Sequence, residues 1–229
     1  MDDNSENDYE ILTDEYMTMD LNFKIIIIGD AGVGKSSLTN KAIKNIFDVT
    51  YSPTIGLEYS TMNIRIKDKK IKLQIWDTCG QEKFRSMITS FYRNTSLAIL
   101  TYAINEKQSF YNIENWLNEL KTYSNPEIKI FLVGTKSDLE KSREVQREDA
   151  ENIYKEHQLD YFIETSAYTG FNVQNVFIQA AKELYKVHLR YKDRGSRIGS
   201  FTESVDEQNY HNILLDDENK GIQKKGCCG

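Results

Sequence analysis

The chain has 229 residues, of which 39% are hydrophobic, and a formal net charge of −6 at pH 7. This length fits one domain with extensions, and no apolar run approaches the ~20 residues that a transmembrane helix needs. The first residues do not show the basic and then apolar pattern of a secretory signal, so we expect none. Three cysteines, Cys79, Cys227 and Cys228, give no disulfide framework and suit a reducing cytosol.

The negative charge is concentrated at the start of the chain. Eight acidic residues and no basic one precede Lys24, and removing these eight charges from the net −6 leaves +2 for the rest. We therefore expect residues 1–22 to form an acidic disordered arm, either a partner-binding tail or a solubilising leader. The nearly neutral remainder gives no case for nucleic-acid binding.

From Phe23 onward, apolar segments alternate with helical patterns. Six segments are expected to form strands, at residues 23–29, 57–66, 71–76, 97–102, 128–133 and 161–163. Helices are expected at about 35–46, between residues 76 and 97, and around 113–120, 149–157 and 173–184. The charged turn 67–70 predicts a hairpin. The order predicts an α/β fold with a six-stranded, mostly parallel sheet, one antiparallel hairpin and helices on both faces.

The first expected strand runs into the sequence GDAGVGKSS at residues 29–37. The spacing of Gly29, Gly34, Lys35 and Ser36 is typical of a phosphate-binding loop, in which backbone N–H groups surround phosphate oxygens at a helix N-terminus. Lys35 can reach the β and γ phosphates, and the Ser36 hydroxyl can hold Mg²⁺. The alternative is a Gly-rich turn that binds nothing, but strand, loop and helix follow in the order that the motif demands. The sequence therefore predicts a P-loop NTPase.

Ligands of such sheets bind at the carboxyl ends of the strands, so polar segments at those ends are candidate site residues. Asp77 follows a strand and can bind the Mg²⁺ shell, and the Gly80 N–H can approach a γ-phosphate. Gln81 can orient an attacking water. Thr54, in the loop 47–56, can join the metal and the γ-phosphate when that phosphate is present.

Two further strand ends fit a guanine base. Asp138 can accept hydrogen bonds from N1–H and the exocyclic amine of guanine, a pair of donors that adenine lacks. In the segment 164–167, backbone N–H groups can meet the guanine O6. Each segment taken alone is also a common turn sequence. Their occurrence at successive strand ends, in step with the phosphate loop, predicts a nucleotide-gated switch.

Residues 23 to about 188 resemble a small GTPase of the Ras superfamily, and the Rab family in particular. The resemblance rests on KLQIWDTCGQEKFRS at 72–86, TIGLEY at 54–59, FYRN at 91–94 and the paired cysteines near residue 229. It implies a Rab-like GTPase domain over residues 23–190 that binds GTP or GDP with Mg²⁺ and hydrolyses GTP to GDP and phosphate. Gln81 is then the catalytic residue of a switch that regulates intracellular vesicle trafficking.

The resemblance also implies which residues form each part of the site. Contacts to GTP are expected from Ala31, Gly32, Val33, Gly34, Lys35, Ser36, Ser37, Phe47, Tyr51, Thr54, Gly80, Thr135, Lys136, Asp138, Ser166, Ala167 and Tyr168. The expected metal ligands are Ser36, Thr54 and Asp77. The expected effector surface comprises Ile55, Tyr59, Trp76 and Phe91. Trp76 fits a core position equally well.

Several residues depart from the family pattern. Cys79 stands where alanine is usual, Ala31 where Rab proteins often have serine, and Ala103 where aspartate is common. Thr135 replaces the usual asparagine of the base-binding motif, and Tyr168 replaces a lysine whose stem lies along the base. A GTP-dependent scaffold that barely hydrolyses nucleotide is therefore the alternative to a cycling GTPase. An ATPase or small-molecule kinase is disfavoured by Asp138.

The end of the chain carries a second expected function. Residues 191–229 are expected to form a flexible tail in which Cys227 and Cys228 are both prenylated. Basic residues at 186–197 fit either an anionic membrane or an ordinary solvated helix face. We expect a monomer on the cytoplasmic face of intracellular membranes that cycles with the cytosol. Expected partners are effectors, an exchange factor and a GTPase-activating protein, with a prenylation escort and a GDP-dissociation inhibitor implied by the resemblance.

Overall fold

A mostly parallel sheet with helices on both faces forms the body of the protein. The structure is a computed structural model that describes residues 9–13, 18–48, 56–80 and 91–193. The strands are β1 Tyr9–Leu12, β2 Leu21–Gly29, β3 Leu57–Ile66, β4 Lys69–Thr78, β5 Leu97–Ala103, β6 Lys129–Thr135 and β7 Tyr161–Glu164. The helices are α1 Lys35–Lys44, α3 Lys107–Tyr111, α4 Ile113–Tyr123, the 3-10 helix η2 Ser137–Ser142, α5 Arg147–Glu156 and α6 Val173–Asp193. The predicted α/β fold class is confirmed.

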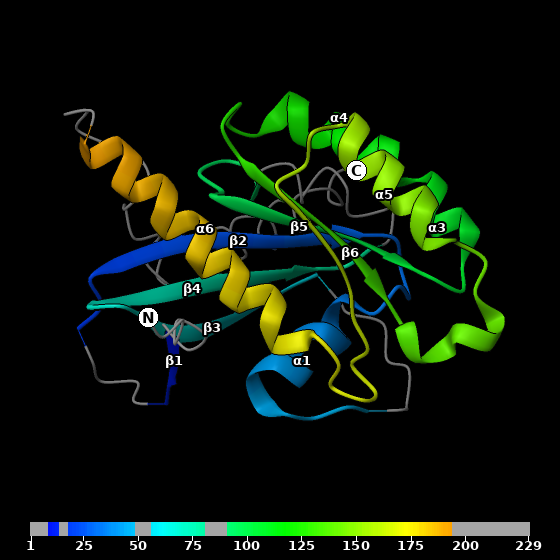
Figure 1. The fold of residues 1–229 in the computed structure, drawn as a ribbon, viewed down its shortest axis with the longest axis horizontal. Helices are drawn as coiled ribbons and strands as arrows, with labels where there is room; N and C mark the ends of the chain where they lie inside the picture. Colours follow the sequence, from blue (N-terminus) through cyan, green and yellow to red (C-terminus); the bar gives the residue numbers. More distant parts are fainter. Residues whose placement is uncertain (1–8, 14–17, 49–55, 81–90, 194–229) are drawn as a thin grey trace, which may run out of the picture.

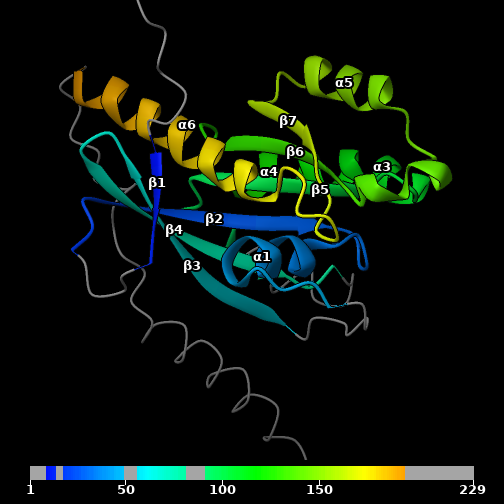
Figure 2. The ribbon, with the colours of Figure 1, turned by 60° about the horizontal axis from the view of Figure 1, so that its bottom comes forward.

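The strand order β1-β3-β4-β2-β5-β6-β7 places β2 in the middle of the sheet. β2 pairs in parallel with β4 and β5, whereas the β3–β4 hairpin is antiparallel as predicted. Two hydrophobic cores cover the two faces: α1 and α6 pack on one, and α3, α4 and α5 on the other (Figures 1 and 2). Successive residues 25–28 of β2 alternate between these cores because side chains alternate across a strand. This burial on both faces explains the continuous apolar run.

The acidic segment at the start of the chain supplies a strand that the sequence reading missed. The expectations of six strands and of disorder throughout residues 1–22 are wrong for β1, which pairs antiparallel with β3 from Tyr9↔Ile66 to Leu12↔Asn63. Tyr9 and Ile11 pack against the core, and the Tyr9 ring lies 5.1 Å from the Lys182 ammonium of α6. Glu10 forms an ion pair with Arg65. The sequence analysis did not predict this strand because its two alternating apolar residues stand among many acidic ones. In the sheet, β1 covers part of the otherwise open edge of β3.

Some element boundaries differ from the predicted ones. α1 ends at Lys44, not at residue 46, because Asn45 adopts a left-handed conformation with φ 54°. α6 continues to Asp193, well beyond the predicted apolar face. A helix was expected between residues 76 and 97. Residues 81–90 of this interval lie outside the described residues, so that helix stays a prediction. Among the helices in the described ranges, none is long and apolar enough to cross a bilayer.

Candidate nucleotide site

The phosphate loop joins β2 to α1 at the carboxyl end of β2. Gly29 has φ 142°, and a Cβ at this position would lie 2.3 Å from the Thr101 carbonyl oxygen. Gly34, directly before α1, has φ 101°. Both conformations exclude ordinary side chains, so the two glycines of the motif are required by the turn itself. The loop leads directly into the N-terminus of α1, where unpaired backbone N–H groups favour the binding of anions.

The Lys35 side chain folds back into this loop. Its Nζ donates hydrogen bonds to the carbonyl oxygens of Gly29 at 2.9 Å and Asp30 at 2.7 Å. Only 5% of the residue is exposed, and this burial lowers the pKa of Lys35 to about 8, against the opposing effects of Asp77 and Asp30. These two hydrogen bonds hold the Lys35 ammonium against the loop, where phosphate oxygens can bind it.

Ser36 and Asp77 bring together oxygen ligands from α1 and β4. The Ser36 hydroxyl donates a hydrogen bond to Asp77 Oδ2, while the buried Asp77 Oδ1 has no hydrogen-bond partner among the described residues. Burial raises the pKa of Asp77 to about 6, although Ser36 and Lys35 oppose the shift. A hydroxyl and a carboxylate with a free oxygen are ligands that Mg²⁺ accepts. These residues fit the expected metal; Thr54, the third expected ligand, lies outside the described residues.

The segment after β4 lies directly against the phosphate loop. A Cβ on Gly80 would be 2.3 Å from the backbone nitrogen of Ala31 and 2.4 Å from the carbonyl oxygen of Asp30. Cys79 is buried, and its N–H donates to the Gly56 carbonyl oxygen at 3.0 Å. Gly80 therefore lies directly against the phosphate loop, and its contact with a bound phosphate stays a prediction. Gln81 and Tyr51 lie outside the described residues, so their roles stay predictions.

The loops after β6 and β7 meet at the place predicted for the base. Asp138 Oδ1 accepts a hydrogen bond of 2.6 Å from the Ser166 hydroxyl, and the Ser137 N–H donates to the Thr165 carbonyl oxygen at 3.0 Å. Thr135 is buried, and its hydroxyl bonds the carbonyl oxygens of Val33 and Tyr102. Thr135 thus links the phosphate loop to the sheet in addition to its expected place at the base.

Two aromatic side chains close one side of this region. The rings of Phe47 and Tyr168 meet edge to face, with centroids 5.5 Å apart and planes at 74°. Tyr168 is 64% exposed, so the contact lies at the surface. The residue that departs from the family pattern therefore touches the other aromatic residue expected at the base. An aromatic ring can cover a base face as a lysine stem does.

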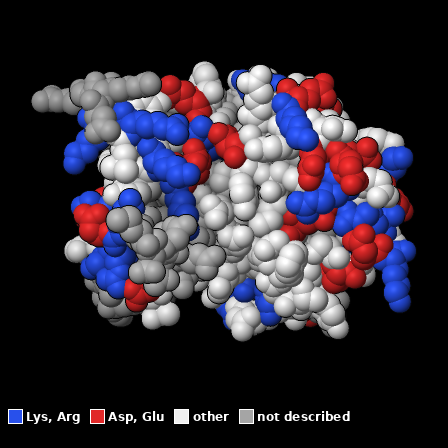
Figure 3. Space-filling model, viewed as in Figure 1, with Lys and Arg blue, Asp and Glu red and all other residues white. Residues whose placement is uncertain are grey.

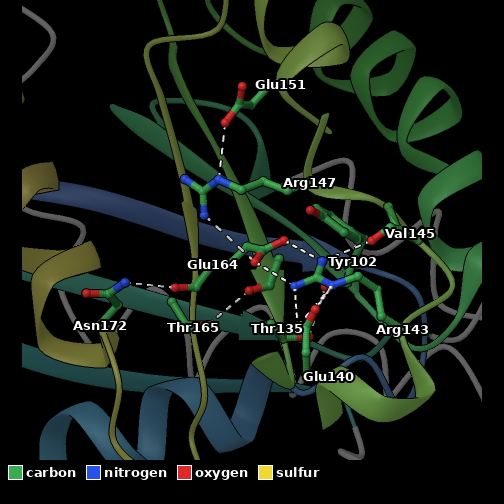
Figure 4. Close-up of polar contacts among 11 residues, drawn as sticks. Tyr102, Thr135, Glu140, Arg143, Val145, Arg147, Glu151, Glu164, Thr165 and Asn172 are labelled. Atoms are coloured by element: carbon green, nitrogen blue, oxygen red, sulfur yellow. Dashed lines mark hydrogen bonds and ion pairs between the residues drawn. The ribbon is translucent and has the colours of Figure 1, made fainter. Parts of the chain in front are cut away.

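An ion-pair network around the buried carboxylate of Glu164 supports the base-binding loops, and the sequence analysis did not predict it (Figure 4). Glu164, at the end of β7, forms two hydrogen bonds with Arg143, at 2.8 and 2.9 Å. Arg143 also bonds Glu140 in η2 and the Val145 carbonyl oxygen. These hydrogen bonds raise the pKa of Arg143, with that from Glu164 the largest cause. The signal available in the sequence is a glutamate at the end of a buried strand, since a buried charge needs a partner.

The expected effector residues form an aromatic cluster on β3, β4 and the segment before β5. The Trp76 ring centroid lies 5.0 Å from that of Tyr59 and 5.3 Å from that of Phe91. Trp76 is 4% exposed and Phe91 8%, which fits the core interpretation of Trp76 in this structure. The Lys24 ammonium lies 5.6 Å from both rings and donates to the Phe91 carbonyl oxygen at 2.7 Å. Ile55 lies outside the described residues.

These features define a P-loop nucleotide-binding protein. A sequence model of the Ras family matches residues 24–186. The chain is 38% identical to the Ras-related protein Rab11B of Nicotiana tabacum, over 98% of this chain and 96% of that protein. It is 39% identical to RABA1c of Arabidopsis thaliana, over 94% and 96%. It is 40% identical to YPTC6 of Chlamydomonas reinhardtii, over 90% and 94%. The chain therefore belongs to the Ras family of small GTPases and, within it, to the Rab proteins.

Proposed function

We propose that this small GTPase binds and hydrolyses GTP and thereby switches steps of intracellular vesicle trafficking. The observation that carries the proposal is the convergence of three groups at the carboxyl ends of the strands. These are the phosphate loop with Lys35, the Ser36–Asp77 pair and the Asp138–Ser166 pair. They match the phosphate, metal and base contacts that a guanine nucleotide requires.

In the proposed reaction each residue has one task. Lys35 and the loop N–H groups bind the β and γ phosphates, and Asp138 accepts the two donors of guanine. Ser36 and Asp77 hold Mg²⁺, which when bound neutralises charge on the phosphate oxygens. Gln81 orients the attacking water. Gly80 responds to the presence of the γ phosphate, and its position against the loop supports this role.

The test begins with the nucleotide that copurifies with the protein, followed by single-turnover hydrolysis of GTP. Gln81→Leu should keep nucleotide affinity and slow hydrolysis, whereas Ser36→Asn should favour GDP through loss of metal support. Asn118→Ala, an exposed change on α4, is the control. A protein that retains GTP without turnover, and whose Gln81→Leu variant behaves identically, would instead be a GTP-dependent scaffold.

Base specificity has its own variant. Asp138→Asn should move preference from guanine toward xanthine nucleotides, because the amide can donate to the additional oxygen of xanthine. Competition between GDP and xanthosine diphosphate measures the change. Equal preference in the parent and the variant would place the base elsewhere.

We also propose that Cys227 and Cys228 carry two prenyl groups that hold the protein on the cytoplasmic face of membranes. One lipid chain anchors only marginally, so stable residence needs two signals. Figure 3 shows lysine and arginine side chains gathered over the far end of α6, where Lys186, Arg190 and Lys192 are exposed. The pKa of His188 is lowered by burial and also by Lys192 and Lys69, so basic groups of α6 and the β3–β4 hairpin lie near one another.

Intact mass measurement of protein from its native cells should show two isoprenoid additions. Cys227→Ser or Cys228→Ser should leave partial, salt-sensitive membrane binding, and the double variant should be cytosolic. Membrane-bound protein with an unmodified tail would contradict the proposal. Partners of the lipidated form are expected to be an escort for prenylation and a GDP-dissociation inhibitor, besides effectors, an exchange factor and an activating protein.

A further inference from the structure

The phosphate loop contains an acidic residue, Asp30, whose role neither the motif nor the family pattern explains. A carboxylate close to bound phosphates is electrostatically unfavourable. In the structure both of its oxygens accept hydrogen bonds from outside the loop. Oδ1 accepts from the Trp116 indole Nε1 at 2.8 Å, and Oδ2 accepts from the Asn112 side-chain amide at 2.6 Å. Two N–H donors therefore offset the charge and fix the direction of the side chain.

One donor lies in α4 and the other directly before it, and α4 packs in the core. Trp116 is 1% exposed and packs in the cluster that α4 shares with β2 and β5, while Asn112 directly precedes the helix. The indole has one N–H and can make only one such bond. Asp30 therefore joins the phosphate loop to a helix that is packed in the core and lies more than 80 residues further along the chain.

The backbone of Asp30 lies between the two groups expected to touch the terminal phosphates. Its carbonyl oxygen accepts the hydrogen bond from Lys35 Nζ at 2.7 Å. Its carbonyl carbon and the next backbone nitrogen, that of Ala31, are the atoms that a Cβ on Gly80 would approach at 2.3 Å. A rotation of the Asp30–Ala31 peptide would therefore move both the anchor of the Lys35 ammonium and the surface against which Gly80 packs.

We propose that Asp30 is a positioning residue for phosphate recognition. The hydrogen bonds from Asn112 and Trp116 hold its carboxylate, and they thereby fix the orientation of the Asp30–Ala31 peptide that binding of the β and γ phosphates requires. We call this pair of hydrogen bonds the Asp30 clamp. This inference rests on the proposed binding of guanine nucleotides. In that proposed function the base is recognised by Asp138 and Ser166, which follow β6 and β7 and are joined by a hydrogen bond. The clamp should therefore act on the phosphate contacts of a nucleotide and leave the base contacts unchanged.

The comparison of GDP with GMP separates these contacts, because GMP keeps the base and lacks the β phosphate. In the full-length protein, Asp30→Ala should weaken GDP binding about tenfold to a hundredfold and GMP binding by less than about threefold. Asp30→Asn keeps one acceptor oxygen and should give an intermediate loss. Trp116→Phe and Asn112→Ala each remove one donor and should weaken GDP selectively. Asn115→Ala, an exposed change on the same helix, should alter neither affinity.

A spectroscopic measurement follows the clamp directly. The chain contains two tryptophans, so a ¹⁵N–¹H spectrum shows two indole N–H resonances, and Trp116→Phe assigns one of them by its loss. Asp30→Ala should move the Trp116 indole proton upfield, because the hydrogen bond to a carboxylate is lost. Addition of GDP should shift this resonance in the parent protein and not in Asp30→Ala.

Any one of three results would overturn the inference. If Asp30→Ala lowers the affinities for GDP and GMP by equal factors, or lowers only the melting temperature, Asp30 merely anchors α4. An indole resonance that is the same in Asp30→Ala and the parent would show that the hydrogen bond does not form in solution. If the parent protein binds GDP and only the Asp30 variants fail to behave as expected, the proposed function survives. If the parent binds no guanine nucleotide, both proposals fall.

Discussion

Replacement of Arg143 by methionine should destabilise the protein far more than replacement of Glu140, one of the two glutamates that Arg143 contacts, by alanine. Arg143 holds two glutamates in similar forked hydrogen bonds, at 2.8 and 2.9 Å to Glu164 and from 2.7 to 3.0 Å to Glu140. Their surroundings differ, since the Glu164 side chain is 7% exposed and that of Glu140 is 66% exposed. Methionine keeps most of the apolar stem of Arg143 and leaves the Glu164 charge buried.

The size of the effect follows from that burial. Breaking a buried ion pair by removing one partner costs about 3–5 kcal/mol. Arg147 Nη1 lies 3.8 Å from the second oxygen of Glu164 and partly compensates, so we expect about 3 kcal/mol. For a domain of this size, that free energy corresponds to a fall in melting temperature of about 6–12 °C. Release of GDP should also become faster, because the network joins η2, the short helix that contains Asp138, to the end of β7.

Thermal unfolding in the presence of excess GDP and stopped-flow release of a fluorescent GDP analogue measure the two effects. Glu140→Ala is the matched control and should change the melting temperature only slightly, because exposed ion pairs contribute little. Combining Arg143→Met with Glu164→Gln should recover more than half of the lost stability, since no unpaired buried charge remains. Equal falls for Arg143→Met and Glu140→Ala, or no recovery in the double variant, would refute the argument from burial.

Four further predictions follow from the site. Burial lowers the pKa of Lys24 from 10.5 to about 8. Between about pH 8 and pH 10.5, Lys24 is therefore protonated more often in the unfolded chain than in the folded protein. Its contribution to the free energy of unfolding accordingly rises with pH in this range. Urea unfolding at pH 8 and 10 should show this rise in the parent and less of it in Lys24→Met. Gly80→Ala should weaken GDP binding at least about tenfold, because its Cβ would lie 2.3 Å from the Ala31 nitrogen; unchanged affinity in a titration would contradict this. Tyr168→Ala should speed GDP release severalfold and Tyr168→Phe should not, since only the ring contacts Phe47. EDTA should accelerate GDP release from the parent protein, whereas Asp77→Ala should release GDP quickly with or without EDTA.

The sequence by itself determined the local features of the fold and the site. Glycine at positions 29 and 34 and lysine at 35 specify a loop between a strand and a helix, because their spacing and backbone freedom act within a few residues. The apolar alternation located the hairpin and six of the seven strands found in the described residues. Polar residues at or just after the expected strand ends indicated Asp77 and Asp138, since the ends of parallel strands meet at one edge of a sheet. In the structure Asp77 is the next-to-last residue of β4.

The tertiary structure alone decided which distant residues meet. The Asp30–Trp116 hydrogen bond spans 86 residues, and the forked pair of Arg143 and Glu164 spans 21. β1 forms by pairing with the open edge of β3. The local sequence, which is rich in acidic residues, does not predict that pairing. Strand order and helix packing bring these groups together, and neither is encoded in the spacing of the residues themselves. Sequence patterns of short period therefore identify the groups that bind a ligand, whereas the contacts that hold those groups in place depend on the folded sheet.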